Sequence, residues 1–437
     1  MENIQNNTAA FVPAVSTKDV PRAEANNSRA VQRISNYRLA VGWFMNVVWI
    51  VSLFALDWDA QWHINVGRDG FWTPPHLVFY STVAICGVLC LGVTLLETLL
   101  YYRRYPGIND EATTPCLFIF HGPIGFMLAG FGMLIMLSSA PLDDYWHRIF
   151  GIDLEIWTPF HVMLLLGISI ANLGMLYLFA SEMNRRKAWA KPGPTNLLLA
   201  NLRDLVRPAT LGLAVAGMAM YTRLWFLFAE TSFGISGKPG TLTLGTYKLS
   251  AYSLVLAGVP FLLVALVYAT GRPGIATLTG LLLLVFRFFD VILVNLGIQS
   301  LAVGQGISLR SEVNDNLGIF TTYPVYTFAA GLLIDIVYLL TRRWRSAGGG
   351  WHTLLVGVGS SLGAGVLLFL IERPWETFNN TINELLKTNS NPLLTSFLKN
   401  SMFYPAYWQA LPLVIVIAML AGVVGMGLAT SLRYTER

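Results

Sequence analysis

Charged residues are scarce in this sequence. Asp, Glu, Lys and Arg together make up 12% of its 437 residues, whereas hydrophobic residues make up 54%. About one residue in four is charged in a typical soluble domain, so this composition excludes that class. Long apolar segments alternate with polar connections, and a helix satisfies its own backbone hydrogen bonds in lipid. The sequence therefore predicts an all-α polytopic integral membrane protein.

Cysteine is also rare. The three cysteines, Cys86, Cys90 and Cys116, are too few for a disulfide framework. Cys86 and Cys90 lie inside an apolar segment, where we expect small buried side chains. Residues 1–38 lack the apolar core of a signal peptide. We interpret this polar stretch as a mostly disordered or surface-lying cytoplasmic tail.

Ten apolar segments follow the polar stretch, and each is near or above the roughly 20 residues that a membrane-spanning helix needs. They lie at about 39–57, 74–101, 115–138, 158–181, 208–229, 249–270, 274–298, 323–341, 352–371 and 406–431. The sequence thus predicts about ten transmembrane helices.

Basic residues orient these helices. They form short clusters between the apolar segments, for example Arg103 with Arg104 and "RRWR" at 342–345. With ten spans, every cluster falls on one side, which the positive-inside rule identifies as cytoplasmic. Both termini are then cytoplasmic. The net charge of +5 does not indicate a nucleic-acid partner, because the basic residues fall in these short clusters between apolar segments.

One phrase occurs twice. It reads "DAQWHINVGRDGFWTPPH" at 59–76 and "DDYWHRIFGIDLEIWTPFH" at 143–161, with one extra residue in the second copy. The copies share two Asp, two Trp, two His, a Gly and a Thr-Pro pair. Four of the six histidines of the chain lie in them. Capping and membrane anchoring do not require this whole set.

The spacing brings three side chains of each copy together. An Asp precedes a His by four residues, so both lie on one face of a helical turn. Thr-Pro predicts a helix start, which puts the second His in the first turn of the next span. The candidate ligands are Asp59, His63 and His76 in the first copy, and Asp143, His147 and His161 in the second.

Two imidazoles and one carboxylate favour a metal site over the hydrogen bonding of a lone interfacial His. The set suits copper, non-haem iron or zinc, so the ligands alone do not identify the metal. Haem held by two His on one straight helix is disfavoured, because Gly67 and a Thr-Pro pair interrupt the helix. Residues expected around the ligands are Trp62, Arg68, Asp69, Trp146 and Asp153.

The pattern D-x-x-W-H…R-D…T-P-x-H before an apolar helix resembles the C subunit of the copper membrane monooxygenases, the family of particulate methane and ammonia monooxygenase. Asp59, His63 and His76 match the first metal motif of that family, Asp-x3-His-x12-His. The second family motif is a first ligand followed by x3-His-x13-His. Asp143, His147 and His161 have this spacing. The family typically has Asn at this position, so Asp143 makes the second site more anionic.

The resemblance covers about residues 39–182 and implies copper as the cofactor. It implies other membrane monooxygenase subunits and a membrane lipid or quinol as partners. The implied reaction inserts oxygen from O2 into a small apolar substrate or ammonia. The implied location is a bacterial inner membrane with both motifs at the outer face. A C-subunit-like region of four helices would span 39–190, before a six-helix region of open role at 191–437.

Two other functions remain open from the sequence. The chain could handle or transport copper or zinc, which would favour further His, Cys or Met ligands in facing spans. It could also be a non-catalytic subunit whose metals only hold helices together.

Four charged residues lie inside predicted spans: Arg223, Arg287, Asp290 and Asp335. Charges in a membrane usually face the protein interior and pair with one another. Arg287 and Asp290 are three residues apart on one helix face. This spacing favours a mutual salt bridge over a proton or substrate path.

Overall fold

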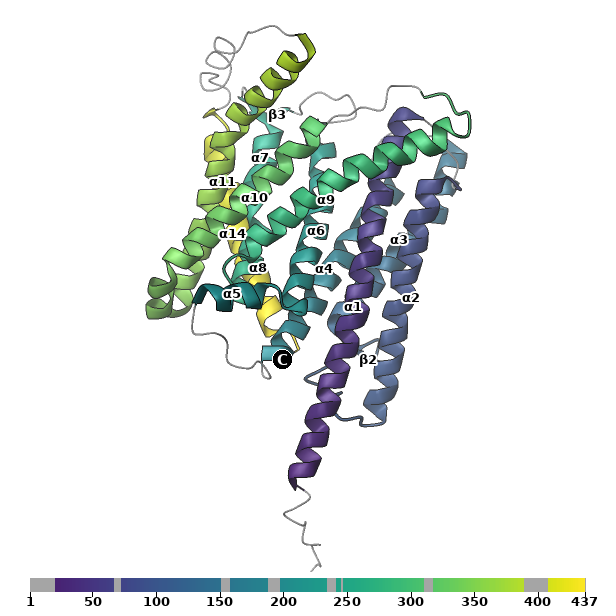
Figure 1. The fold of residues 1–437 in the computed structure, drawn as a ribbon, viewed down its shortest axis with the longest axis vertical. Coiled ribbons are helices and arrows are strands. Elements are labelled where there is room, and N and C mark those ends of the chain that lie inside the picture. The colour runs from purple at the N-terminus through teal and green to yellow at the C-terminus, as the bar shows by residue number, and fades with distance from the viewer. Residues whose placement is uncertain are drawn as a thin grey trace, which may run out of the picture.

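The computed structural model describes residues 20–66, 72–150, 158–187, 197–233, 241–244, 247–309, 317–388 and 408–436. Within these ranges, eight helices are long and apolar enough to cross a membrane. The prediction of an all-α membrane protein is therefore confirmed. Figure 1 shows the long helices side by side in one bundle.

The longer helices are α1 (Val20–Asn65), α2 (Pro74–Tyr102), α3 (Ile124–Phe150), α4 (Pro159–Lys187), α6 (Pro208–Phe233), α9 (Ile275–Ile298), α10 (Leu317–Leu340), α11 (Arg342–Thr388) and α14 (Leu411–Tyr434). The shorter helices are α5 (Leu197–Leu205), α7 (Ala251–Gly258), α8 (Pro260–Thr270) and the π-helical η1 (Gln299–Val303). Two antiparallel hairpins pair β1 (Thr114–Cys116) with β2 (Phe120–Gly122) and β3 (Thr241–Leu244) with β4 (Tyr247–Ser250).

Helix α1 corrects the prediction for the N-terminal stretch. It begins at Val20, so residues 20–38 are helical and are not the expected disordered or surface-lying tail. Its first turns extend beyond the bundle (Figure 1). Residues 1–19 lie outside the described part of the chain. The later turns are packed rather than tail-like, because Ser35 and Arg38 are fully buried.

Two predicted spans differ from the structure. Residues 114–122 form the β1–β2 hairpin, so the third long helix begins at Ile124 rather than near 115. The segment predicted as one span at 249–270 is divided into α7 and α8. Pro260 begins α8, where its missing N–H and fixed φ are tolerated without the loss of an intrahelical hydrogen bond.

Glycines allow α3 and α4 to approach closely. A Cβ at Gly132 would lie 2.4 Å from the backbone N of Ala171, and one at Gly174 would lie 2.2 Å from that of Ala129. Small residues at such crossings let helix backbones touch, which increases van der Waals contact in lipid. The two helices are therefore fixed against each other along the middle of their length.

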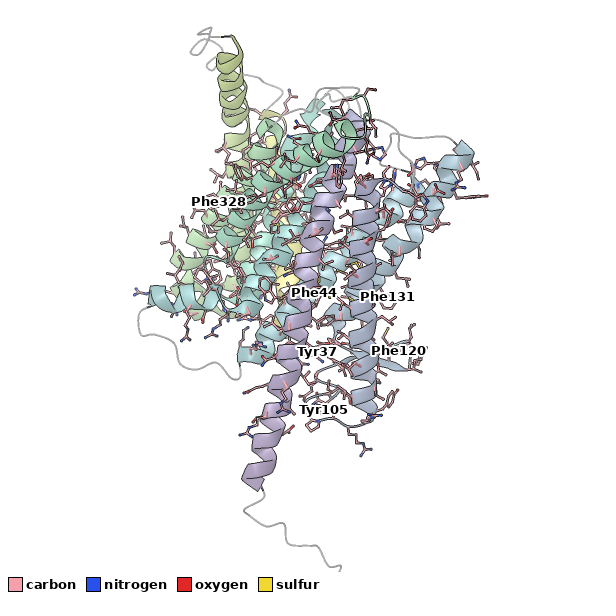
Figure 2. The ribbon with its side chains drawn as sticks, turned by 45° about the vertical axis from the view of Figure 1, so that its right-hand side comes forward. Tyr37, Phe44, Tyr105, Phe120, Phe131 and Phe328 are labelled. Atoms are coloured by element: carbon pink, nitrogen blue, oxygen red, sulfur yellow. The ribbon has the colours of Figure 1, made fainter. Side chains whose placement is uncertain are left out.

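Apolar side chains cover the outside of the bundle. Phe44 and Phe131 are 54% and 41% exposed and lie at mid-height (Figure 2). Lipid tails contact such a surface without the cost that water would impose.

A buried ionic cluster joins the helix ends away from the repeated phrase. Arg38 donates to both carboxylate oxygens of Glu97, with its Nε 2.7 Å from Glu97 Oε1. Glu182 lies 3.7 Å from Arg38 and accepts from Ser35 at 2.5 Å. Glu436 lies beside this cluster and accepts from the backbone N of Ile124 at 2.7 Å. Helices α1, α2 and α4 and the segment after α14 therefore meet at one charged junction.

We predict that Gly132→Ala destabilises the protein by about 1–3 kcal/mol, because the new methyl group forces α3 and α4 apart. The matched control is Gly92→Ala, since a Cβ at Gly92 meets nothing within 4 Å. Thermal unfolding in detergent measures both effects. Equal melting temperatures for the two variants would contradict the close packing.

We also predict a pH dependence from Glu436. Burial raises the pKa of this carboxyl group from 4.5 to about 6. The folded protein thus binds the proton more tightly than the unfolded chain, and this contribution to stability is lost as the pH rises from about 4.5 through about 6. Glu436→Gln stays neutral and should flatten the fall in melting temperature over that interval. Glu111→Gln, which alters an exposed residue, should leave the fall unchanged, and a wild-type profile for both variants would refute the assignment.

Candidate metal centres

The two copies of the repeated phrase lie at one end of the bundle. In each copy, the Asp and the first His occupy the last turns of one helix, α1 or α3. The second His is the third residue of the next helix, α2 or α4. Two successive helix ends therefore supply each cluster, as the spacing predicts.

The Thr-Pro pairs begin the second helices. Thr158 Oγ1 accepts a hydrogen bond from the backbone N of His161 at 3.4 Å, so it caps the turn that carries that ligand candidate. Thr73 occupies the N-cap position of α2 in an extended conformation, and Pro74 follows it as the first helical residue. Local sequence thus places His76 and His161 directly at the helix starts.

The first cluster consists of Asp59, His63 and His76. Asp59 Oδ1 lies 3.0 Å from Nε2 of His76 and 3.7 Å from Nε2 of His63. The two imidazole centroids are 6.1 Å apart. The three side chains are partly buried.

The second cluster, formed by Asp143, His147 and His161, has nearly the same dimensions. Asp143 Oδ2 lies 3.3 Å from Nε2 of His147 and 3.6 Å from Nε2 of His161. The imidazole centroids are 6.0 Å apart. In both clusters one potential ligand atom per residue lies within 4.8 Å of the other two.

These distances fit a first-row transition metal ion. An ion with tetrahedral bonds of about 2.1 Å holds its donor atoms about 3.4 Å apart, and the four carboxylate–imidazole distances lie on both sides of that value. Asp143 Oδ1 is shielded from solvent and has no hydrogen-bond partner among the described residues, whereas Asp59 Oδ1 is shielded and faces the imidazole nitrogen of His76. A buried acceptor without a donor is costly, and a bound cation would satisfy it.

Tyr80 connects the two clusters electrostatically. It lies one helical turn after His76 on α2, with the two ring centroids 6.3 Å apart. Its hydroxyl group interacts with the negative charges of both Asp59 and Asp143. The two carboxylates therefore share one electrostatic environment on this side of α2.

Of the five residues expected around the ligands, the structure describes the two tryptophans. Trp62 is 3% exposed and packs with Val294 and Ile298 of α9. Trp146 packs against the rings of Phe150 and Phe160. Arg68, Asp69 and Asp153 lie outside the described residues.

The predicted salt bridge between Arg287 and Asp290 is present, at 2.6 Å. Sequence reasoning missed its third member, Asp57, whose Oδ2 lies 2.6 Å from the same Arg287 nitrogen. Arg223 lies 3.5 Å from Asp57 and donates to the backbone O of Leu53 at 2.9 Å. All four charged groups are buried. Asp57 lies at the end of the apolar segment predicted at 39–57, two residues before Asp59. A carboxylate at that position needs a cation, so the sequence did contain a signal for this ion pair.

Asp335 has a structural role. Its Oδ2 accepts hydrogen bonds from the backbone N and the hydroxyl group of Thr277, at 2.8 and 2.6 Å. These bonds satisfy the first turn of α9, which otherwise has unpaired N–H groups. The carboxylate of α10 therefore caps a neighbouring helix.

The chain matches no family model, no curated protein and no solved structure in the comparisons made. The resemblance to the copper membrane monooxygenases therefore rests on the motif residues and their spacing.

We predict that Arg287→Met destabilises the protein by about 3–5 kcal/mol, because it leaves Asp57 and Asp290 buried without their shared cation. It should also weaken metal binding at the first cluster more than at the second, since Asp57 and Asp59 share α1. Asp144→Asn is the control: it breaks the pair of the partly buried Asp144 with the exposed Arg148 beside the second cluster and should cost at most about 1 kcal/mol. Thermal unfolding and metal titration measure both effects, and equal losses in the two variants would refute the anchoring role of Arg287.

Proposed function

We propose that this chain is a copper-binding subunit of a membrane monooxygenase-like complex. The observation that carries the proposal is the pair of Asp-His-His clusters, each with carboxylate–imidazole distances between 3.0 and 3.7 Å. Two equal sets of this kind exceed what helix capping or interfacial anchoring requires. The reaction would insert oxygen from O2 into a small apolar substrate or ammonia.

The proposal includes a topology of ten spans. Within the described residues, eight helices have the length and composition of membrane spans. We count α6 as the ninth span and the α7–α8 pair as the tenth. Both termini are then cytoplasmic, where the basic clusters gather. Both Asp-His-His clusters lie at the outer face, in a bacterial inner membrane.

Bound copper would supply one-electron redox chemistry and open coordination positions. Within the protein, Asp59 and Asp143 would offset the charge of the ions, and the helix ends would fix the imidazole directions. Exposed apolar residues at the same ends, including Leu77, Ile149 and Phe150, give a weakly polar substrate access from lipid. Other membrane subunits and a quinol would complete the complex.

A second candidate is copper handling. The sulfur atoms of Cys90 and Met45 are 3.9 Å apart in the core between α2 and α1, and Cys86 Sγ lies 4.0 Å from the backbone O of Met45. Two sulfur ligands bound to one ion at about 2.3 Å each can have this separation, and soft sulfur ligands select Cu(I). A chain that passes copper through the membrane would need such a site below the Asp-His-His clusters.

We predict that the purified wild-type protein binds two copper ions per chain, one for each cluster. His63→Ala and His147→Ala should each lose about one ion, because a site with two protein ligands binds far more weakly. His121→Ala is the control, since its ring stacks on Tyr101 at 3.7 Å away from both clusters. Elemental analysis measures the content, and a wild-type protein free of copper, iron and zinc would end the metal proposals.

Activity and sulfur variants separate the candidates. Oxygen-dependent oxidation of ammonia or a small hydrocarbon by membranes, lost in His63→Ala or His147→Ala despite normal folding, supports the monooxygenase. Metal binding without such oxidation favours a structural subunit. Copper retained in the histidine variants but lost in Cys86→Ser/Cys90→Ser would favour copper handling.

A further inference from the structure

A pocket of about 320 Å³ lies at the other end of the bundle from the Asp-His-His clusters. It is formed where α8, α10 and α14 end and α11 begins, with Asn201 of α5 at its side. The end of α14 is fixed there, because Asn184 Nδ2 donates to the backbone O of Leu432 at 2.9 Å. His161 and Asn184 are on α4, about 35 Å apart along its axis. The pocket is therefore separate from the proposed metal centres.

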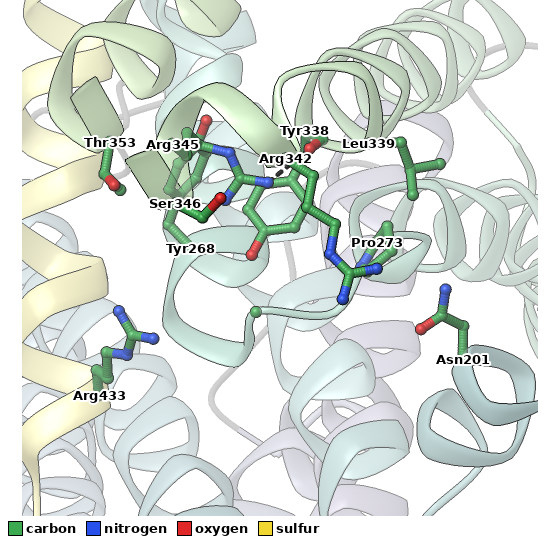
Figure 3. A pocket seen from close by; sticks show the side chains of 11 residues that line it. Asn201, Tyr268, Pro273, Tyr338, Leu339, Arg342, Arg345, Ser346, Thr353 and Arg433 are labelled. Atoms are coloured by element: carbon green, nitrogen blue, oxygen red, sulfur yellow. Dashed lines mark hydrogen bonds between the residues drawn. The ribbon is translucent and has the colours of Figure 1, made fainter. Parts of the chain in front are cut away.

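Three arginines line the pocket without an acidic side chain beside them. They are Arg342 and Arg345 of α11 and Arg433 of α14. Figure 3 shows Arg433 on one side and the two other guanidinium groups on the opposite side. The hydroxyl groups of Ser346 and Thr353 also belong to the lining. Both hydroxyl groups donate to backbone oxygens, at 2.8 Å to Arg343 and at 3.1 Å to Gly349. The three guanidinium groups are therefore the feature that suits an anion with several oxygen acceptors.

Contacts with the protein hold one of the arginines in place. The guanidinium of Arg345 stacks 3.5 Å from the ring centroid of Tyr338, and its Nη2 donates to the backbone O of Tyr338 at 2.6 Å. Tyr268 forms a second aromatic wall, 5.6 Å from the same group. Such preorganisation lowers the entropy cost of binding a ligand.

The other two arginines have no ion pair with the described residues. The nearest acidic side chain on the neighbouring α5, Asp204, pairs with Arg207 at 2.9 Å. Its backbone O accepts from Arg272 at 3.2 Å. Asp204 is thus already paired outside the pocket. Arg342 and Arg433 are both exposed and remain available to an external anion.

The surroundings favour a ligand that is part of the membrane. Leu340, Trp344 and Trp351 flank the pocket in the chain and are 79%, 50% and 74% exposed. Tryptophan collects at the level of lipid headgroups, where its ring is apolar and its N–H is polar. Basic pockets between helix ends on the cytoplasmic side bind anionic headgroups.

We propose that this pocket binds a phosphate-bearing anion through Arg342, Arg345 and Arg433, and that the phosphate belongs to an anionic phospholipid. Arg345 contributes a fixed donor array. The other two arginines close on the phosphate from the ends of different helices. A bound headgroup thereby links α11 to α14.

Binding of phosphatidylglycerol and phosphatidylcholine to the purified full chain in detergent tests the proposal. We expect phosphatidylglycerol to bind about 100-fold more tightly, because each of the three arginines near the headgroup contributes about fivefold. Arg342→Gln/Arg433→Gln should weaken phosphatidylglycerol binding about 25-fold and leave phosphatidylcholine binding unchanged. The matched control is Arg343→Gln, since Arg343 is exposed in the same segment but does not line the pocket.

Inorganic phosphate distinguishes the two sources of the anion. Competition by millimolar phosphate, lost in the double variant, would assign the pocket to a soluble phosphate compound. Failure of phosphate to compete, with arginine-dependent lipid binding, assigns it to the headgroup. Equal binding of both lipids, or an equal loss in Arg343→Gln, would overturn the proposal. Circular dichroism and thermal unfolding of each variant show whether the fold is kept.

Discussion

The buried carboxylate of Asp57 ties α1 to two later helices, α6 and α9. A charge without a partner at this depth costs several kcal/mol, so Asp57 must meet a cation. Arg287 of α9 lies 2.6 Å away and Arg223 of α6 lies 3.5 Å away. Asp290 balances the second positive charge. The later helices thus hold α1 at the level where Asp59 projects.

The geometry of the two clusters follows from where helices end in a membrane. Irregular backbone is costly in hydrocarbon, so turns lie at the ends of spans. An Asp and a His four residues apart at such an end share a face, and a Thr-Pro helix start returns the second His beside them. Local rules therefore give matching imidazole separations of 6.1 and 6.0 Å. Asp143, in place of the Asn of the family pattern, gives both clusters the same type of ligand.

Sequence patterns predicted the structural features that depend on residues close together in the chain. The limits of α2, the start of α4, the Thr158 cap and the Arg287–Asp290 pair are of this kind. Contacts between distant segments were not predictable from periodicity. The pairing of Arg38 with Glu97 on another helix is one, and it makes residues 35–38 part of the packed helix. The Pro260 break within an apolar run was missed because composition alone does not show where a helix stops.

The two clusters are supported by different contacts. The first depends on α1, which the Asp57 cluster holds against α6 and α9. The second depends on α3 and α4, which touch at Gly132 and Gly174 through backbone contacts. Additivity holds for sites that share no partners, so disturbing one support should leave the other cluster assembled. Tyr80 of α2 is the side chain that lies within electrostatic reach of both carboxylates. Each cluster otherwise retains its own scaffold.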